Sequence, residues 1–324
     1  LKVYNEVVQV LQDEIGVDPM RETEELALQI ERLEGDWRFE VGEIQVSSPF
    51  IGRRKEIDLF THLLIQTATG QGRVMIFTGE PGIGKTRLIQ ETTRLASRNG
   101  FQSLTAQCYQ MEQALPYQPV IDLVRQMMEY DHSWQQLASV WMRELALLLP
   151  EMEEVAVAAM AAAPPSDELD ESQQGRLFQA IFHLFANKAD QHKLLLVVED
   201  IQWADVTTLQ CLHYLARHII HVPIALIFTL REESLSTNTD LAALLDNLHR
   251  EANAKSLSLS RLTRNETNAL LMKSADTAPF SDRLGQWLYQ ETAGHPVFFT
   301  SRLQSLREEG LLDNAAATDW QMLA

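Results

Sequence analysis

The feature that most constrains this chain is the run Gly79-Glu80-Pro81-Gly82-Ile83-Gly84-Lys85-Thr86. It fits the pattern GxxxxGK[ST], in which glycines let the backbone curl so tightly that its N–H groups point at phosphate oxygens. The apolar residues 74–78 before it predict a strand, and 86–98 predicts a helix whose N-terminus faces the anion. The run therefore predicts a nucleoside triphosphate site, with Lys85 on the β- and γ-phosphates and the Thr86 hydroxyl on magnesium. Arg87, the next residue, is counted with this binding loop.

A second signal is an apolar run that ends in two acids. Residues 194–198 are unbroken Leu and Val, which is typical of a strand buried on both faces of a parallel sheet. Glu199 and Asp200 follow directly, so one carboxylate can organise magnesium while its neighbour activates water. We expect both acids to serve as metal-site and catalytic residues together with Lys85. Asp205 precedes an apolar helical stretch and is expected to cap that helix.

The rest of the chain alternates between helical and extended patterns. Further strands are expected at 103–107 and 223–230 and near 256–259, and helices at 53–69, 119–147 and 206–220. This alternation predicts an α/β domain with a doubly wound parallel sheet. Arg231 follows one of these strands, and carboxyl ends of neighbouring parallel strands meet in one crevice, so it is expected near the γ-phosphate.

The domain organisation follows from where the pattern changes. Residues 1–35 predict two short helices, and 36–49 a linker. Residues 50–260 form the α/β core, and 261–324 a helical lid with the start of a following domain. The chain begins at Leu1 within a helix-like pattern and without an initiator Met, so we expect a fragment of a longer protein.

Charge and composition restrict the classes of partner that we expect for this chain. The chain has 45 acidic residues against 27 Lys and Arg, a formal charge of −18. Such a surface repels phosphate backbones, so DNA binding is expected only through domains outside this chain. Two distant cysteines, Cys108 and Cys211, and no apolar run of about 20 residues favour a cytoplasmic location and no membrane partner.

These motifs together resemble the STAND class of signal-transducing ATPases, a branch near the AAA+ ATPases, and in particular the ATPase modules of large bacterial transcriptional regulators. Phe50-Ile51-Gly52-Arg53-Arg54-Lys55-Glu56 resembles the GR-x-x-E motif, which implies that Ile51, Gly52 and Arg53 lie on the adenine side of the site. The loop at 79–86 is similar to the Walker A motif, and Glu199 to Asp205 to the Walker B region with its Trp-Ala-Asp sequence. Arg231 matches the sensor arginine, and Gly294-His295-Pro296 the G-x-P motif, which implies that Pro296 lies near the base.

The resemblance implies an ATP- or ADP-binding regulatory switch with Mg²⁺ and slow hydrolysis. Its nucleotide state would control oligomerisation, as a homo-oligomer, or DNA binding. The family generally has Asp where this chain has Glu199, and Mg²⁺ demands near-ideal geometry, so hydrolysis is less secure than binding. Residues 4–30 resemble the end of a bacterial transcriptional activation domain, a stack of tetratricopeptide-like helices.

Two alternatives stay open. One is a cycling ATPase that acts on nucleic acid, of the clamp-loader or origin-binding type, and the other is a scaffold that holds ADP without turnover. Asn187-Lys188-Ala189-Asp190 fits the NKxD pattern of guanine recognition. It precedes the acidic strand, whereas the guanine motif follows it, so adenine is preferred.

Overall fold

The computed structural model describes residues 50–130, 137–149, 173–274 and 282–312. The predicted helices of 1–35 and the linker 36–49 lie outside the described residues, as does 313–324.

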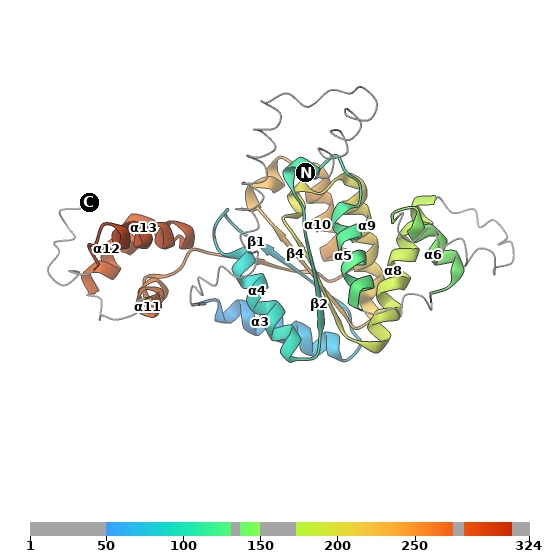
Figure 1. The fold of residues 1–324 in the computed structure, drawn as a ribbon, viewed down its shortest axis with the longest axis horizontal. Helices are drawn as coiled ribbons and strands as arrows, with labels where there is room; N and C mark the ends of the chain where they lie inside the picture. Colours follow the sequence, from blue (N-terminus) through green and yellow to red (C-terminus); the bar gives the residue numbers. More distant parts are fainter. Residues whose placement is uncertain (1–49, 131–136, 150–172, 275–281, 313–324) are drawn as a thin grey trace, which may run out of the picture. The chain divides into compact units, whose positions relative to one another are not determined.

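A five-stranded parallel sheet forms the centre of the core, in the order β2-β3-β4-β1-β5. The strands are β1 (Arg73–Thr78), β2 (Gln102–Gln107), β3 (Leu194–Glu199), β4 (Ile224–Leu230) and β5 (Lys255–Ser258). Every residue of β3 and β4 is buried, which a parallel strand covered by helices on both faces requires. The expected α/β fold with a doubly wound parallel sheet is confirmed (Figure 1).

Helices cover the two faces of this sheet (Figure 1). They are α3 (Arg54–Ala68), α4 (Lys85–Arg98), α5 (Gln118–Tyr130), α8 (Gln173–Gln191), α9 (Val206–His218) and α10 (Thr239–Glu251). A further helix, α6 (Ser139–Ala146), packs against α8. Short 3₁₀ turns are η2 (Gln110–Glu112), η5 (Ile201–Trp203), η6 (Ile219–His221) and η7 (Glu232–Ser236). Because strand side chains alternate, Met75 and Phe77 pack with α3 and α4, whereas Val74 and Ile76 pack with α5, α8, α9 and α10.

Three helices follow β5 and correspond to the predicted lid. They are α11 (Arg264–Ser274), α12 (Asp282–Thr292) and α13 (Pro296–Glu308). They have an apolar cluster of their own, which includes Leu262, Leu271, Leu288 and Phe299. The helical character expected for this part of the chain is therefore confirmed for the described residues.

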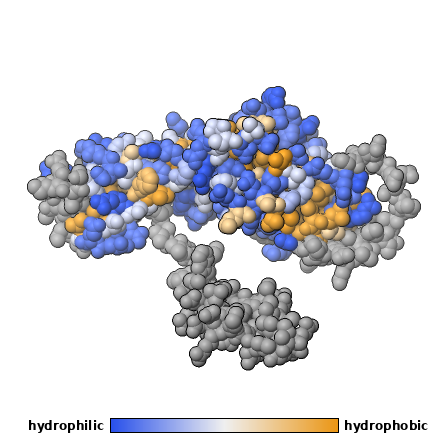
Figure 2. Space-filling view, turned by 90° about the horizontal axis from the view of Figure 1, so that it is seen from above, coloured by the Kyte–Doolittle hydropathy of each residue, from blue (hydrophilic) through white to orange (hydrophobic). Residues whose placement is uncertain are grey.

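The visible surface in Figure 2 is mostly hydrophilic, with hydrophobic residues in separate patches. No helix in the described ranges has the length and apolar character needed to cross a membrane.

Candidate functional site

The glycine loop joins β1 to α4, as the sequence predicted. Gly82 and Gly84 have φ of 75° and 100°, in the left-handed region that suits residues without a Cβ. Gly84 is the residue immediately before α4, so the helix N-terminus opens directly on the loop. This is the arrangement in which backbone N–H groups and the helix dipole favour an anion.

Lys85 is the first residue of α4 and only 8% exposed. Its ammonium donates hydrogen bonds to the carbonyl oxygens of Gly79 at 2.9 Å and Glu80 at 3.0 Å. Burial lowers the pKa of Lys85, while the nearby carboxylate of Asp200 opposes that shift. A buried cation is thus held against the loop, where it would neutralise phosphate charge.

Thr86 and Glu199 lie together although 113 positions separate them. The Thr86 hydroxyl donates to Glu199 Oε2 at 2.8 Å, and the Glu199 side chain, 7% exposed, closes β3. Burial raises the pKa of Glu199, and the bond from Thr86 works in the opposite direction. A hydroxyl and a carboxylate beside a phosphate loop are the oxygen ligands that Mg²⁺ takes, so this pair fits the metal.

Asp200 follows Glu199 with φ 56° and ψ 43°, a left-handed conformation uncommon for a residue with a side chain. Its N–H donates to Thr229 Oγ1 at 2.9 Å, which ties the turn to β4. Its carboxylate oxygens accept from two amides, Gln202 at 2.9 Å and Gln107 at 3.3 Å. The end of β3 therefore presents two carboxylates in different surroundings. Glu199 is hydrogen-bonded to Thr86 of α4, and Asp200 is hydrogen-bonded to two glutamine side chains.

Arg231 follows β4 and is half-buried. Its guanidinium lies over the ring of Trp203, 5.7 Å from the ring centroid. The backbone N–H of Arg231 donates to Gln202 Oε1 at 3.2 Å. Trp203 also packs against the core. The strand order places β4 between β3 and β1, so Arg231 leaves the sheet between the acids and the glycine loop.

The GR-x-x-E segment contacts the same loop. Arg53 has φ 62° and donates from its guanidinium to the carbonyl oxygen of Ile83 at 3.1 Å and to Glu56 at 3.3 Å. Ile51 packs against the apolar cluster of the lid, and Gly52 lies against Glu266 of α11. Arg87 lies over the ring of Phe50, 5.8 Å from its centroid.

The lid also reaches the glycine loop. Pro296 is the first residue of α13, a position that its fixed φ and missing N–H suit. The residue before it, His295, is buried and its Nε2 lies 3.0 Å from the carbonyl oxygen of Pro81. Arg261 donates to the Glu80 carboxylate at 2.8 Å, and this bond lowers the pKa of Glu80. Two consecutive loop residues are thus held from the lid side.

Asp205 has a separate task. Its side chain accepts from the backbone N–H groups of Thr207 and Thr208, so the predicted helix cap is confirmed. Burial by itself raises the pKa of Asp205, but the hydrogen bonds from Thr207 and Thr208 outweigh it and lower the pKa.

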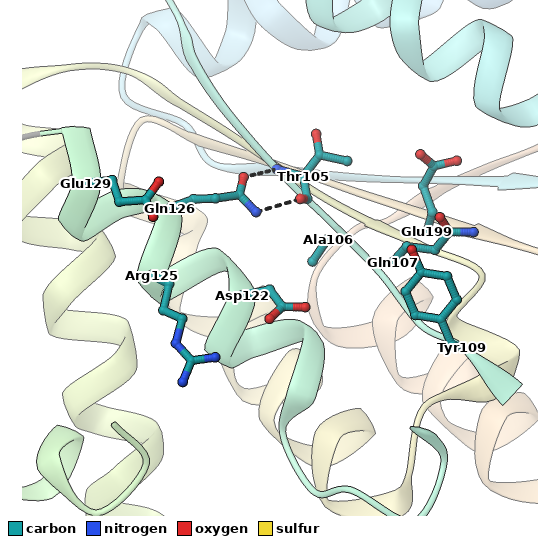
Figure 3. Close-up of a pocket in the computed structure, with 9 residues that line it drawn as sticks. All are labelled: Thr105, Ala106, Gln107, Tyr109, Asp122, Arg125, Gln126, Glu129 and Glu199. Carbon is teal, nitrogen blue, oxygen red and sulfur yellow. Dashed lines mark hydrogen bonds between the residues drawn. The ribbon is translucent and has the colours of Figure 1, made fainter. Parts of the chain in front are cut away.

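A cavity of about 430 Å³ adjoins Glu199 on the side of β2 and α5 (Figure 3). Its polar wall is made by Gln107 and Tyr109 at the Glu199 end and by Asp122 and Arg125 of α5. Gln126, also on its wall, pairs with both the N–H and the carbonyl of Thr105, which covers part of the free edge of β2.

Sequence reasoning missed the polar residues that hold the acids. Gln107, Gln202 and Thr229 bind Asp200, and Arg261 binds Glu80. Gln202 lies inside the quoted Walker B segment, and Gln107 and Thr229 lie at the ends of strands beside the acidic one. A search for amides and hydroxyls at these carboxyl ends could have found them.

Comparison with known proteins identifies the family of this chain. Residues 49–228 match the family model of the AAA ATPase domain, which is more than half of the 324 residues. Among solved structures, the chain is similar to Cdc6p from Pyrobaculum aerophilum, with a TM-score of 0.50 and 12% identity over 85% of this chain and 66% of that one.

Two further solved structures are similar. They are a Signal Transduction ATPase with Numerous Domains (STAND) protein with a tetratricopeptide repeat sensor from Pyrococcus horikoshii and AMPPCP-bound DnaA from Aquifex aeolicus. The first has a TM-score of 0.43 and 15% identity over 77% of this chain and 29% of that one. The second has a TM-score of 0.43 and 13% identity over 80% and 62%.

At these identities the similarity to solved structures concerns the fold alone, and this chain spans no more than 66% of the length of any of the three. No curated protein matched the chain. The family match covers the glycine loop and both acids of the site and ends before Arg231 and the lid. This chain belongs to the AAA ATPase domain family.

Proposed function

We propose that this chain is an ATP-binding switch module with slow hydrolysis, in which the nucleotide state sets the position of the lid. The observation that carries this proposal is the direct contact between lid and glycine loop. His295 reaches the carbonyl of Pro81, and Arg261 binds Glu80, so loop and lid cannot move independently while these bonds hold.

The nucleotide would be held by the residues already described. The loop 79–86 and Arg87 would bind the phosphates, with Lys85 on the β- and γ-phosphates. Ile51, Gly52, Arg53 and Pro296 would surround the adenine. The contacts of Ile51 with the apolar cluster of the lid and of Arg53 with Ile83 support this assignment, because they bring core and lid to one place. Pro296 begins α13 directly after His295, which contacts Pro81.

Mg²⁺ would be held by Thr86 and Glu199, with Asp200 nearby, and when bound it would neutralise charge on the phosphate oxygens. Hydrolysis would use Asp200 as general base. The water oxygen bonds to the γ-phosphorus, the bond from that phosphorus to the β–γ bridging oxygen breaks, and Asp200 takes the water proton. Arg231 would contact the γ-phosphate.

The switch has a simple thermodynamic requirement. ATP and ADP must differ in their relative affinity for the closed and open lid, because a ligand shifts an equilibrium only by its differential affinity. Moving the lid from about 1:99 to 99:1 would need about 5.5 kcal/mol. The contacts of Arg231 and Lys85 with a γ-phosphate are the source that we assign to that difference.

The biological setting is also a proposal. The resemblance of residues 4–30 to a transcriptional activation domain supports a module of a cytoplasmic bacterial transcriptional regulator. We propose the boundaries 1–35, 36–49, 50–260 and 261–324 for its parts. The output would be homo-oligomerisation or DNA binding by domains outside this chain, since a charge of −18 disfavours DNA contact here.

The test combines binding, turnover and lid position. Fluorescent ADP is bound with Mg²⁺ and displaced by ATP or GTP, single-turnover hydrolysis is timed with and without duplex DNA, and amide exchange of α13 is compared in ATP and ADP. We expect adenine preference, slow turnover unaffected by DNA, and stronger protection of α13 with ATP. Rapid DNA-stimulated turnover would favour a cycling machine, and equal protection with no turnover an ADP-holding scaffold.

A further inference from the structure

One side-chain amide joins Asp200 to Arg231, the residue that follows β4. The side chain of Gln202 is 3% exposed and lies between Asp200 and Arg231. Its Nε2 donates to Asp200 Oδ1 at 2.9 Å, and its Oε1 accepts from the backbone N–H of Arg231 at 3.2 Å. A carboxylate only accepts and a backbone N–H only donates, so the two partners use opposite ends of the amide and fix its orientation.

The turn that carries Gln202 is held to β4 at two more points. The Asp200 N–H donates to Thr229 Oγ1 at 2.9 Å, and the Arg231 guanidinium lies over the Trp203 ring at 5.7 Å. The left-handed backbone of Asp200 begins this turn, η5. The Asp200 carboxylate, the Arg231 backbone and the Arg231 guanidinium are therefore all in contact with one short segment.

We propose that Gln202 is a positioning residue that couples the orientation of the Asp200 carboxylate to the position of Arg231. When the guanidinium of Arg231 moves towards a γ-phosphate, the backbone N–H of Arg231 shifts with it. Because Gln202 accepts from that N–H and donates to Asp200, its side chain follows and the Asp200 carboxylate rotates. This inference rests on the proposed function, because it assigns the step by which that site distinguishes ATP from ADP. Gln107 holds the other oxygen of Asp200 at 3.3 Å, so the carboxylate would turn about that second bond.

The decisive variant is Gln202→Met, which keeps the length of the side chain and removes both hydrogen bonds. The control is Gln126→Met, because the Gln126 amide also makes two hydrogen bonds, to the N–H and the carbonyl of Thr105. Two quantities are measured besides ADP affinity. The first is the single-turnover rate. The second is the change in Trp203 fluorescence between ADP and a non-hydrolysable ATP analogue. The Trp203 signal is obtained by subtracting the fluorescence of the same protein with Trp203→Phe.

We expect Gln202→Met to bind ADP within about threefold of the wild type, as most of the binding groups are untouched. Hydrolysis should fall by about tenfold or more, which corresponds to losing one hydrogen bond to a charged group. The fluorescence difference between the two nucleotides should disappear. In an Arg231→Ala background, Gln202→Met should cause no further loss of fluorescence change or rate, because no guanidinium movement is left for Gln202 to transmit to Asp200.

Gln126→Met should keep the wild-type fluorescence difference even if urea unfolding shows it to be less stable. The inference is overturned if Gln202→Met behaves like Gln126→Met in both rate and fluorescence. If Gln202→Met does not fold, Gln202→Glu is used, which keeps the acceptor for the Arg231 N–H and loses the donor to Asp200, and the same losses are expected. A wild type that binds no adenine nucleotide would instead refute the proposed function.

Discussion

Replacing Gly82 by Ala tests the contact between the glycine loop and the lid. Gly82 has φ of 75°, and an added Cβ would lie 2.9 Å from Val297 Cγ2 and 3.0 Å from His295 Cε1. Both side chains belong to the start of α13, and His295 is held by its contact with the Pro81 carbonyl. The new methyl group could be accommodated only if the loop or α13 moves.

Two costs contribute to the change in stability. An Ala in the left-handed region costs about 1–2 kcal/mol relative to Gly. Overpacking against α13 costs a further 1–3 kcal/mol or so while the lid stays in place. Gly100→Ala separates the two, because Gly100 has φ of 77° and no atom within 4 Å of an added Cβ. We expect that variant to lose only the first amount.

The assay uses the nucleotide-free protein. Urea unfolding gives the free energy for both variants, and trypsin cleavage after Arg261, which is bonded to Glu80 at 2.8 Å, reports lid release. Gly82→Ala should be cleaved several times faster than Gly100→Ala under conditions where both are folded. If the two variants are cleaved equally fast and lose equal stability, Gly82 does not couple the glycine loop to the lid.

Two other changes give clear expectations. Lys85→Met should remove most of the stabilisation that the nucleotide gives. At 100 times its Kd, ATP with Mg²⁺ stabilises the wild type by about 2.7 kcal/mol, and a 100-fold weaker affinity leaves about 0.4 kcal/mol. Unfolding curves with and without the nucleotide measure this difference. Asp205→Ala should cost about 0.5–2 kcal/mol through the lost cap. Because the pKa of Asp205 is lowered from 3.8 by folding, its contribution is complete above that value and is lost as pH falls through the lower folded pKa. Unfolding curves of Asp205→Ala and wild type should therefore converge in acid, and a constant difference would contradict the cap's ionic character.

The glycine loop, the order of helices and strands, and the cap at Asp205 could all be predicted from local sequence. Such features depend on short-range physics: glycines permit positive φ, alternation sets strand faces, and a carboxylate before a helix accepts its first N–H groups. The apolar run at 194–198 predicted a doubly covered strand for the same reason, and β3 is buried throughout.

The partners of the acids depended on the tertiary structure. Thr86 and Glu199 meet because β1 and β3 flank β4 in the sheet, an order that no local pattern contains. Asp200 accepts hydrogen bonds from Gln107 and Gln202, and His295 contacts Pro81. The residue types in these contacts are common in loops and on surfaces, so nothing in the sequence singles them out. The residue types alone predict phosphate and metal ligands, because a hydroxyl, an ammonium and a carboxylate keep their chemistry in any fold. Only the packing of strands and lid decided which polar groups orient them, because orientation depends on distances across the folded chain.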